Sequence, residues 1–298
     1  MAVVNSVYAM NDFLAQGGEG TNNEIDLVTK TVEPRGDEKE LAEITDLIGS
    51  YTTNFASSSA GRAKNVITGV SKVDGTILYP GEEFDLAKTV SPFTQENGYE
   101  LAGAYQNGTV VESFGGGICQ VATTLYNAVI RAELEITMRF NHSMLVHYVE
   151  PSMDAAIAGN YKDLKFKNNL DAPVYIEGYC SGGIIYFNVY GKETRPSNRE
   201  ISFESETVSK TDPKVQFTMD ASLTAGSVSV TQSGQSGCIA QLWKIVKVDG
   251  KQQSRDLFNK SNYQATPKLI TIGTKDATSE TLSALKAAIA TGDEAKVR

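Results

Sequence analysis

Cys119 is the residue best placed to act as a nucleophile. It follows a triple-glycine loop and falls in the first turn of a predicted helix, whose apolar positions include Val121, Leu125 and Ala128. Unpaired amides at a helix N-terminus favour the thiolate over the thiol, and they can also hold a tetrahedral oxyanion. The candidate oxyanion and substrate loop comprises Gly115, Gly116, Gly117 and Gln120.

The candidate bases are the two histidines of the chain, His142 and His147. They lie five residues apart in a region that reads as strand, so we expect them to point to opposite faces. At most one can then meet Cys119, and the pair makes a poor ligand set for a metal. Asn141 and Ser143 give His142 a polar setting, which favours it as the base and leaves His147 as the alternative.

Asp154 is the best available carboxylate to orient the imidazole in a thiol–imidazole–carboxylate arrangement. Four further side chains are candidates for substrate binding: Arg62, Tyr99, Arg139 and Ser143. Each also has an ordinary structural interpretation, the arginines as partners in ion pairs and Tyr99 as a core residue.

The other two cysteines, Cys180 and Cys238, are interpreted as packing residues. Three cysteines cannot form a complete disulfide framework. A cysteine near a helix start is often only a small buried apolar residue, so a structural role for Cys119 stays open.

The elements around these residues predict an α+β domain followed by a small all-β module. An amphipathic helix is expected from Asp37, with Leu41, Ile44 and Ile48 on one face. The cysteine helix would pack on an antiparallel sheet, similar by fold analogy to papain-like and transglutaminase-like cores. A hairpin is expected to turn at residues 181–183, and a separate helix begins at Ser279.

Length and composition fit two folded domains that do not bind nucleic acid. The chain has 298 residues, 41% of them apolar, and a formal charge of -9 without a basic cluster. The beginning of the chain lacks the basic and apolar stretches of a signal peptide or membrane anchor. We therefore expect either a cytoplasmic protein or a chain whose leader has been trimmed, and the motifs below favour trimming.

Residues 51–191 resemble a VanW domain. The resemblance rests on LYPGEEFDLA, NGYELAGAYQNG, GGGICQVATTLYNA, RFNHSMLVHYVEP, MDAAIAGNYKDLKFKNN and APVYIEGY. Residues 200–275 are similar to the five-glycine extracellular module, which ends here in ATPKLITIGTK. Its glycines match Gly226, Gly234, Gly237, Gly250 and Gly273.

The expected organisation follows from these two resemblances. Residues 1–35 form a linker or the remnant of an upstream peptidoglycan-binding repeat, 36–196 the VanW domain, 200–275 the five-glycine module and 276–298 a helical tail. The sequence departs from the family pattern at 84–87, which read Phe-Asp-Leu-Ala. It departs again at 91–94, where Phe93 replaces a common arginine and leaves a substrate-charge contact there in doubt.

The VanW resemblance implies an L,D-transpeptidase of Gram-positive cells. Cys119 would be the nucleophile, His142 the proton shuttle and Asp154 its orienting partner, with no cofactor or metal. The partners would be stem peptides and glycan of peptidoglycan, and the product a direct diaminopimelate–diaminopimelate (3–3) cross-link. The protein would be extracellular, at the wall or the outer membrane face, attached only through an anchor absent from this sequence. Two alternatives stay open: a cell-wall adhesin without catalysis, and a cysteine peptidase that hydrolyses stem peptides.

Overall fold

The computed structural model describes residues 36–106, 109–159 and 161–297, together with a few positions between 7 and 15. It divides into two compact units, Met1–Leu41 and Ala42–Arg298. The linker predicted over residues 1–35 therefore lies almost entirely outside the described residues.

The first unit contains the short helix α2 (Glu38–Leu41). The amide of Glu40 donates to Asp37 Oδ1 over 2.8 Å, and the amide of Asp37 donates to Glu40 Oε2 over 3.3 Å. The longer helix predicted through Ile44 and Ile48 is wrong, because Ile48 belongs to strand β1. Pairing of this strand with β9 satisfies its backbone and overrides the local helical pattern.

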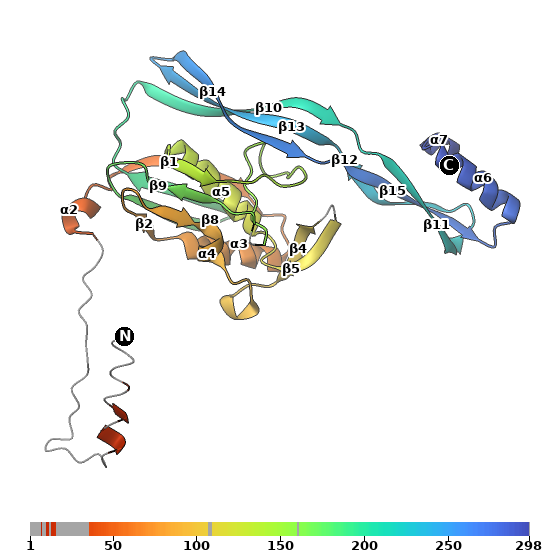
Figure 1. Ribbon diagram of the computed structural model, residues 1–298, viewed down its shortest axis with the longest axis horizontal. Helices are drawn as coiled ribbons and strands as arrows, with labels where there is room; N and C mark the ends of the chain where they lie inside the picture. Colours follow the sequence, from red (N-terminus) through yellow and green to blue (C-terminus); the bar gives the residue numbers. More distant parts are fainter. Residues whose placement is uncertain are drawn as a thin grey trace. The chain divides into compact units, whose positions relative to one another are not determined.

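A four-stranded antiparallel sheet organises the second unit, and Figure 1 shows its strands beside the helices that cover it. The strand order is β1 (Asp46–Asn54), β9 (Ile184–Gly191), β8 (Val174–Ser181) and β2 (Thr76–Leu78). The predicted hairpin with its turn at 181–183 is confirmed as β8–β9. Along β9 every second residue is buried, as expected for a strand with one face against a core.

Helix α5 (Ile118–Arg131) packs on β1 and β9, and helix α3 (Ala60–Val73) packs on β8. Nearly every residue of α5 is buried, so this helix is enclosed on all sides. Close approach of α5 to the sheet depends on Gly49, where a Cβ atom would lie 2.5 Å from the Ala128 carbonyl oxygen. The helix that carries Cys119 is thus fixed in the centre of the domain.

Smaller elements complete the domain and lead into α5. The hairpin β4 (Leu101–Gln106) and β5 (Thr109–Phe114) ends directly before the glycine loop. A second sheet has the order β3 (Glu83–Asp85), β7 (Lys165–Lys167) and β6 (Glu135–Met138). Helix α4 (Leu86–Val90) and a 3-10 turn (Gln95–Asn97) precede β4.

Between β6 and β7 the described residues form an irregular segment, here called the 139–164 loop. The strands predicted around the two histidines are therefore wrong beyond Met138. Helix α5 supplies partners for the backbone of the loop. Thr123 Oγ1 contacts both the amide and the carbonyl of Ala155, and Asn127 Nδ2 donates to the Met153 carbonyl over 2.6 Å. These contacts hold Asp154 against the helix.

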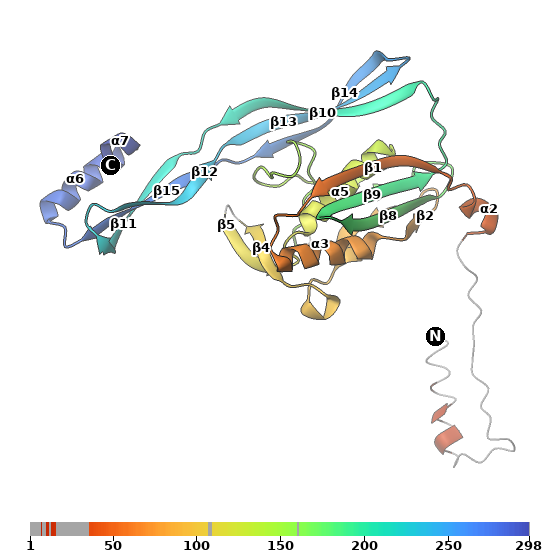
Figure 2. The ribbon, with the colours of Figure 1, turned by 180° about the vertical axis from the view of Figure 1, so that it is seen from behind.

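The C-terminal module is all-β, followed by helices. Its strands are β10 (Arg199–Thr211), β11 (Val215–Thr224), β12 (Val228–Gln235), β13 (Gly237–Val248), β14 (Lys251–Tyr263) and β15 (Thr266–Lys275). They form two three-stranded sheets, β10-β13-β14 and β11-β15-β12, visible from both sides in Figures 1 and 2. The helix predicted from Ser279 is present as α6 (Ser279–Ala290), with α7 (Glu294–Val297) after it.

Candidate active site

Cys119 lies in the first turn of α5, half-buried, as the second residue of the helix. Its Sγ lies 3.5 Å from the amide nitrogen of Ile157 and 3.4 Å from the Ile157 carbonyl oxygen. The Ile157 amide can therefore donate to the thiolate form, which favours that form. The 139–164 loop supplies this donor, and no local sequence pattern indicates the contact.

The three glycines before Cys119 are required by packing inside the protein. A Cβ atom on Gly116 would lie 2.7 Å from the Ala102 carbonyl oxygen, and one on Gly115 would lie 2.8 Å from the Phe93 ring. Gly117 has φ of 113° and caps the helix, a conformation that side chains disfavour. The glycine loop thus packs closely against its neighbours, and this packing alone requires glycine at these positions.

Within the described chain, the amides of Gly117 and Cys119 have no backbone acceptor. The amides of Gly116 and Ile118 are already used on the Ser113 and Gly115 carbonyls. The amides of Gly117 and Cys119 therefore remain candidate donors to an oxyanion.

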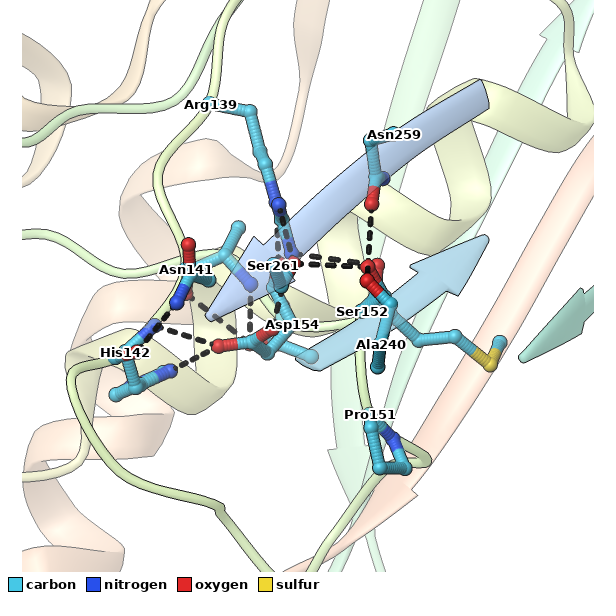
Figure 3. Close-up of polar contacts among 12 residues, drawn as sticks. Arg139, Asn141, His142, Pro151, Ser152, Asp154, Ala240, Asn259 and Ser261 are labelled. Carbon is cyan, nitrogen blue, oxygen red and sulfur yellow. Dashed lines mark hydrogen bonds and ion pairs between the residues drawn. The ribbon is translucent and has the colours of Figure 1, made fainter. Parts of the chain in front are cut away.

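His142 and Asp154 form a short contact within the 139–164 loop. His142 Nδ1 lies 2.6 Å from Asp154 Oδ2, and the His142 amide donates to the same oxygen over 2.7 Å, as Figure 3 shows. With Nδ1 bonded to the carboxylate, Nε2 is left for the thiol. Of the two histidines, His142 makes this contact, while His147 is exposed at the same cavity.

Arg139 completes the environment of Asp154. Its Nη2 donates to Asp154 Oδ1 over 2.9 Å and its Nε to the Asp154 carbonyl over 2.7 Å. Both side chains are buried, at 8% and 1% exposure. Arg139, predicted as a possible substrate contact, is instead committed to this internal ion pair, which keeps the carboxylate charged.

The electrostatics favour a thiolate–imidazolium pair. Burial acts to lower the pKa of His142, but hydrogen bonds and charge from Asp154 and Cys119 outweigh it and raise the pKa to about 9. Burial acts to raise the pKa of Cys119, yet the hydrogen bond and charge of His142 bring it below its usual value. The pKa of Asp154 is likewise lowered, against burial, by His142 and Arg139. The three groups thus stabilise one another in their charged forms.

Cys119 and His142 open onto a cavity of about 840 Å³. Its walls come from the glycine loop, the start of α3 and the 139–164 loop. Among the described residues, its lining contains one arginine and no carboxylate: Asn54, Phe55, Ser57, Ser58, Arg62, Phe93, Gly103, Ser113, Phe114, Gly115, Gly116, Gly117, Ile118, Cys119, Gln120, His142, Val146, His147, Tyr148, Ile157, Ala158 and Gly159.

Arg62 is held in this cavity by neutral partners. Its Nη2 donates to Gln120 Oε1 over 2.8 Å and its Nη1 to Ser58 Oγ over 2.6 Å. Gln120 is buried and anchored in turn, because its Nε2 donates to the Asn54 carbonyl over 2.8 Å. Gln120, expected in the oxyanion loop, thus positions the arginine. An arginine so placed is available to an anionic ligand.

Several residues singled out in the sequence lie away from the cavity. Tyr99 is fully buried and its hydroxyl donates to the Val90 carbonyl over 2.7 Å. Ser143 is absent from the cavity lining, and its carbonyl accepts from the Gln264 amide over 2.7 Å. Cys180 lies in β8 and Cys238 is buried in β13, where burial raises the pKa of both thiols, that of Cys180 to about 11.

Tyr148 lines the cavity and is not among the site residues predicted from the sequence. Its ring lies edge-on to the His142 imidazole, with centroids 6.4 Å apart. Burial and the nearby Cys119 charge raise the pKa of its hydroxyl well above the usual value, so it stays neutral. Tyr148 lies in the apolar run LVHYV, where a tyrosine gives no local indication of a role at the site.

The fold and site define a two-module protein with a cysteine–histidine–aspartate site in its α+β domain. Residues 61–190 match the family described as VanW-like protein, and residues 203–275 match the G5 domain. The chain therefore contains a VanW-like domain followed by a G5 domain. No helix in the described parts of the chain has the length and apolar character to cross a bilayer.

Two curated relatives are similar to this chain. The uncharacterized protein YoaR of Bacillus subtilis is 34% identical over 177 residues, 59% of this chain and 58% of that protein. The vancomycin B-type resistance protein VanW of Enterococcus faecalis is 26% identical over 118 residues, 38% of this chain and 42% of that protein. The chain thus spans about half the length of these relatives.

Two solved G5 structures are also similar. The G5 domain of an IgA1 protease is 26% identical, covering 26% of this chain and 94% of that structure, with a TM-score of 0.20. HP0197-G5 is 24% identical, covering 25% and 99%, with a TM-score of 0.16.

Proposed function

We propose that this protein is a cysteine L,D-transpeptidase that forms 3–3 cross-links in peptidoglycan. The observation that carries the proposal is the Cys119 thiol, which interacts with the His142–Asp154 pair at the wall of a cavity that also contains Arg62. The VanW-like and G5 domains support a peptidoglycan-related role at the cell wall.

In the first step the Cys119 thiolate attacks the carbonyl carbon of the third residue of a tetrapeptide stem. The tetrahedral oxyanion accepts hydrogen bonds from the Gly117 and Cys119 amides. Collapse of the intermediate breaks the amide bond to the terminal D-alanine, and the leaving nitrogen takes a proton from the His142 imidazolium. A thioester on Cys119 and free D-alanine result.

In the second step the side-chain amine of another stem attacks the thioester. His142, now neutral, accepts the proton lost by the amine, and the Cys119 thiolate leaves. The new amide joins the diaminopimelate residues of two stems directly. Asp154 holds the imidazole in the required tautomer through both steps.

Arg62 fits the terminal carboxylate of the donor stem. The stem ends in a D-alanine carboxylate one residue beyond the attacked carbonyl, and Arg62 is the arginine among the described cavity residues. A planar guanidinium can hold a carboxylate through two hydrogen bonds. Arg62→Gln should therefore raise KM for the tetrapeptide donor more than it lowers kcat.

The reaction is tested by mass spectrometry of disaccharide-tetrapeptide fragments after incubation with the full chain. We expect a dimer formed with loss of D-alanine by the native protein and by Cys180→Ala, a matched loss of a half-buried thiol. The Cys119→Ala variant should give no dimer. Trimmed monomers without dimer would indicate a peptidase, and unchanged fragments would point to a binding protein.

A further inference from the structure

Strand β14 of the C-terminal module lies against the loop that carries His142 and Asp154. Three alternate residues of the strand bind the VanW-like domain through their side chains: Asn259, Ser261 and Tyr263. A two-residue period places them on one face of the strand. Ser261 and Tyr263 are 2% and 3% exposed, so water does not compete for these contacts.

Tyr263 bonds Asp154 directly. Its hydroxyl donates to Asp154 Oδ1 over 2.5 Å and accepts from the Ser152 amide over 2.6 Å. Burial, together with the charge of Asp154, raises the pKa of Tyr263 far above its usual value. The phenol therefore stays protonated and acts towards the carboxylate as a donor.

Asp154 receives two donors on each oxygen. Tyr263 and Arg139 bond Oδ1, and two nitrogens of His142 bond Oδ2. This pattern fills the acceptor sites of a carboxylate and fixes its rotation. Oδ2 is thereby directed at the imidazole.

Ser261 and Asn259 extend the same support. Ser261 Oγ accepts from Arg139 Nη1 over 2.9 Å and lies 2.8 Å from Ser152 Oγ, and Asn259 Oδ1 accepts from Ser152 Oγ over 2.6 Å, as in Figure 3. Ser152 has φ of 70°, a conformation rare for residues with side chains. The hydrogen bonds between β14 and Ser152 stabilise this backbone conformation.

We propose that Tyr263 is a positioning residue for the thiol–imidazole–carboxylate site, so that the C-terminal module completes the active site. The inference rests on the proposed function for its chemical meaning. The site itself is built from contacts that exist whether or not the protein cross-links peptidoglycan. Removal of the hydroxyl leaves Oδ1 with Arg139 as its remaining partner and lets the carboxylate turn away from His142.

The test is a histidine NMR titration of the full chain, native and Tyr263→Phe. The two histidines give two signals, assigned with His147→Gln. Native His142 should titrate at about 9. In Tyr263→Phe its pKa should fall by about one unit, because the imidazolium loses its aligned carboxylate. Tyr99→Phe, a matched loss of a buried hydroxyl that donates to the Val90 carbonyl and not to a site residue, should leave the titration unchanged.

The direction of the shift separates positioning from charge neutralisation. A hydroxyl that merely drew charge from Asp154 would, when lost, leave the carboxylate more negative and raise the pKa of His142. An unchanged or raised pKa in Tyr263→Phe therefore overturns the inference. Should that variant not fold, Ser261→Ala, which removes the acceptor of Arg139 Nη1, should shift the pKa of His142 downward too. No shift in that variant overturns the inference equally.

The outcomes also separate this inference from the proposed reaction. A native His142 that titrates near its ordinary value removes the charged site and overturns the inference. If the expected titrations are observed but no cross-linked dimer forms, the reaction is wrong and the positioning role of Tyr263 stands.

Discussion

At the scale of single residues, protonation of His142 couples the site to the stability of the fold. The pKa of His142 is raised from 6.5 to about 9, so its contribution to stability is fully present below 6.5 and is lost as the pH rises through 9. The size expected for a buried group of this kind is on the order of 1–3 kcal/mol.

His142→Gln should lack this part of the pH dependence. Denaturant unfolding of the native protein and the variant, between pH 6.5 and pH 9 or somewhat above, measures it directly. His147→Gln serves as the control, since His147 is exposed and should leave the native profile unchanged. If both variants lose the same stability at each pH, the buried ion pair does not exist.

At this scale the sequence predicts local features and misses contacts made over long sequence separations. The start of α5 can be predicted locally, because the glycine loop interrupts the preceding strand and the apolar positions of a helix follow it. Asp154 and His142 lie 12 residues apart, close enough to be considered together. Tyr263 contacts Asp154 across 109 residues, and nothing local to either residue signals that contact.

At the scale of elements, the packing of α5 on β1 fixes where Cys119 lies. Gly49 allows this approach, because a Cβ there would meet the backbone of Ala128 and Ala132 at 2.5 Å. The helical pattern read through Ile48 concealed this strand, since Leu41, Ile44 and Ile48 satisfy a helical period by coincidence. Pairing with a strand 130 to 145 residues later decided the outcome.

Gly49→Ala should destabilise the protein by about 1–3 kcal/mol, because the added methyl group pushes α5 away from the sheet. Ser50→Ala, at the exposed neighbouring position of β1, should change stability by less than about 0.5 kcal/mol. Urea denaturation midpoints compare the two. Equal midpoints would show that the helix and strand do not meet as closely as described.

At the scale of the whole molecule, a second ion-pair cluster joins the two modules. Glu133, just after α5, binds Arg199 of β10 over 2.6 Å and Lys244 of β13. Burial acts to raise the pKa of Glu133, but these two cations outweigh it and lower the pKa from 4.5 to about 2. The sequence predicts a boundary between the modules near residue 196, and no local pattern indicates the contacts of Glu133 across it.

Glu133→Gln should remove about 2 kcal/mol of stability at neutral pH, since charged hydrogen bonds with partly buried partners are lost. The stability difference between the native protein and Glu133→Gln is fully present above pH 4.5 and disappears as the pH falls towards 2. Glu43→Gln, which breaks the exposed pair with Lys192, should lose less than about 1 kcal/mol. Unfolding curves that shift equally for the two variants would argue against a shared interface.

The central claim is that Cys119 is a thiolate beside a protonated His142, and cysteine alkylation across pH tests it most directly. Peptide mass spectrometry separates Cys119 from Cys180 and Cys238, which act as references within the same chain. We predict that Cys119 reacts fastest near neutral pH, with its midpoint below the value of about 8.5 for a free thiol and shifted upward in His142→Gln. A midpoint at or above that value, or labelling no faster than that of Cys180, would contradict the account.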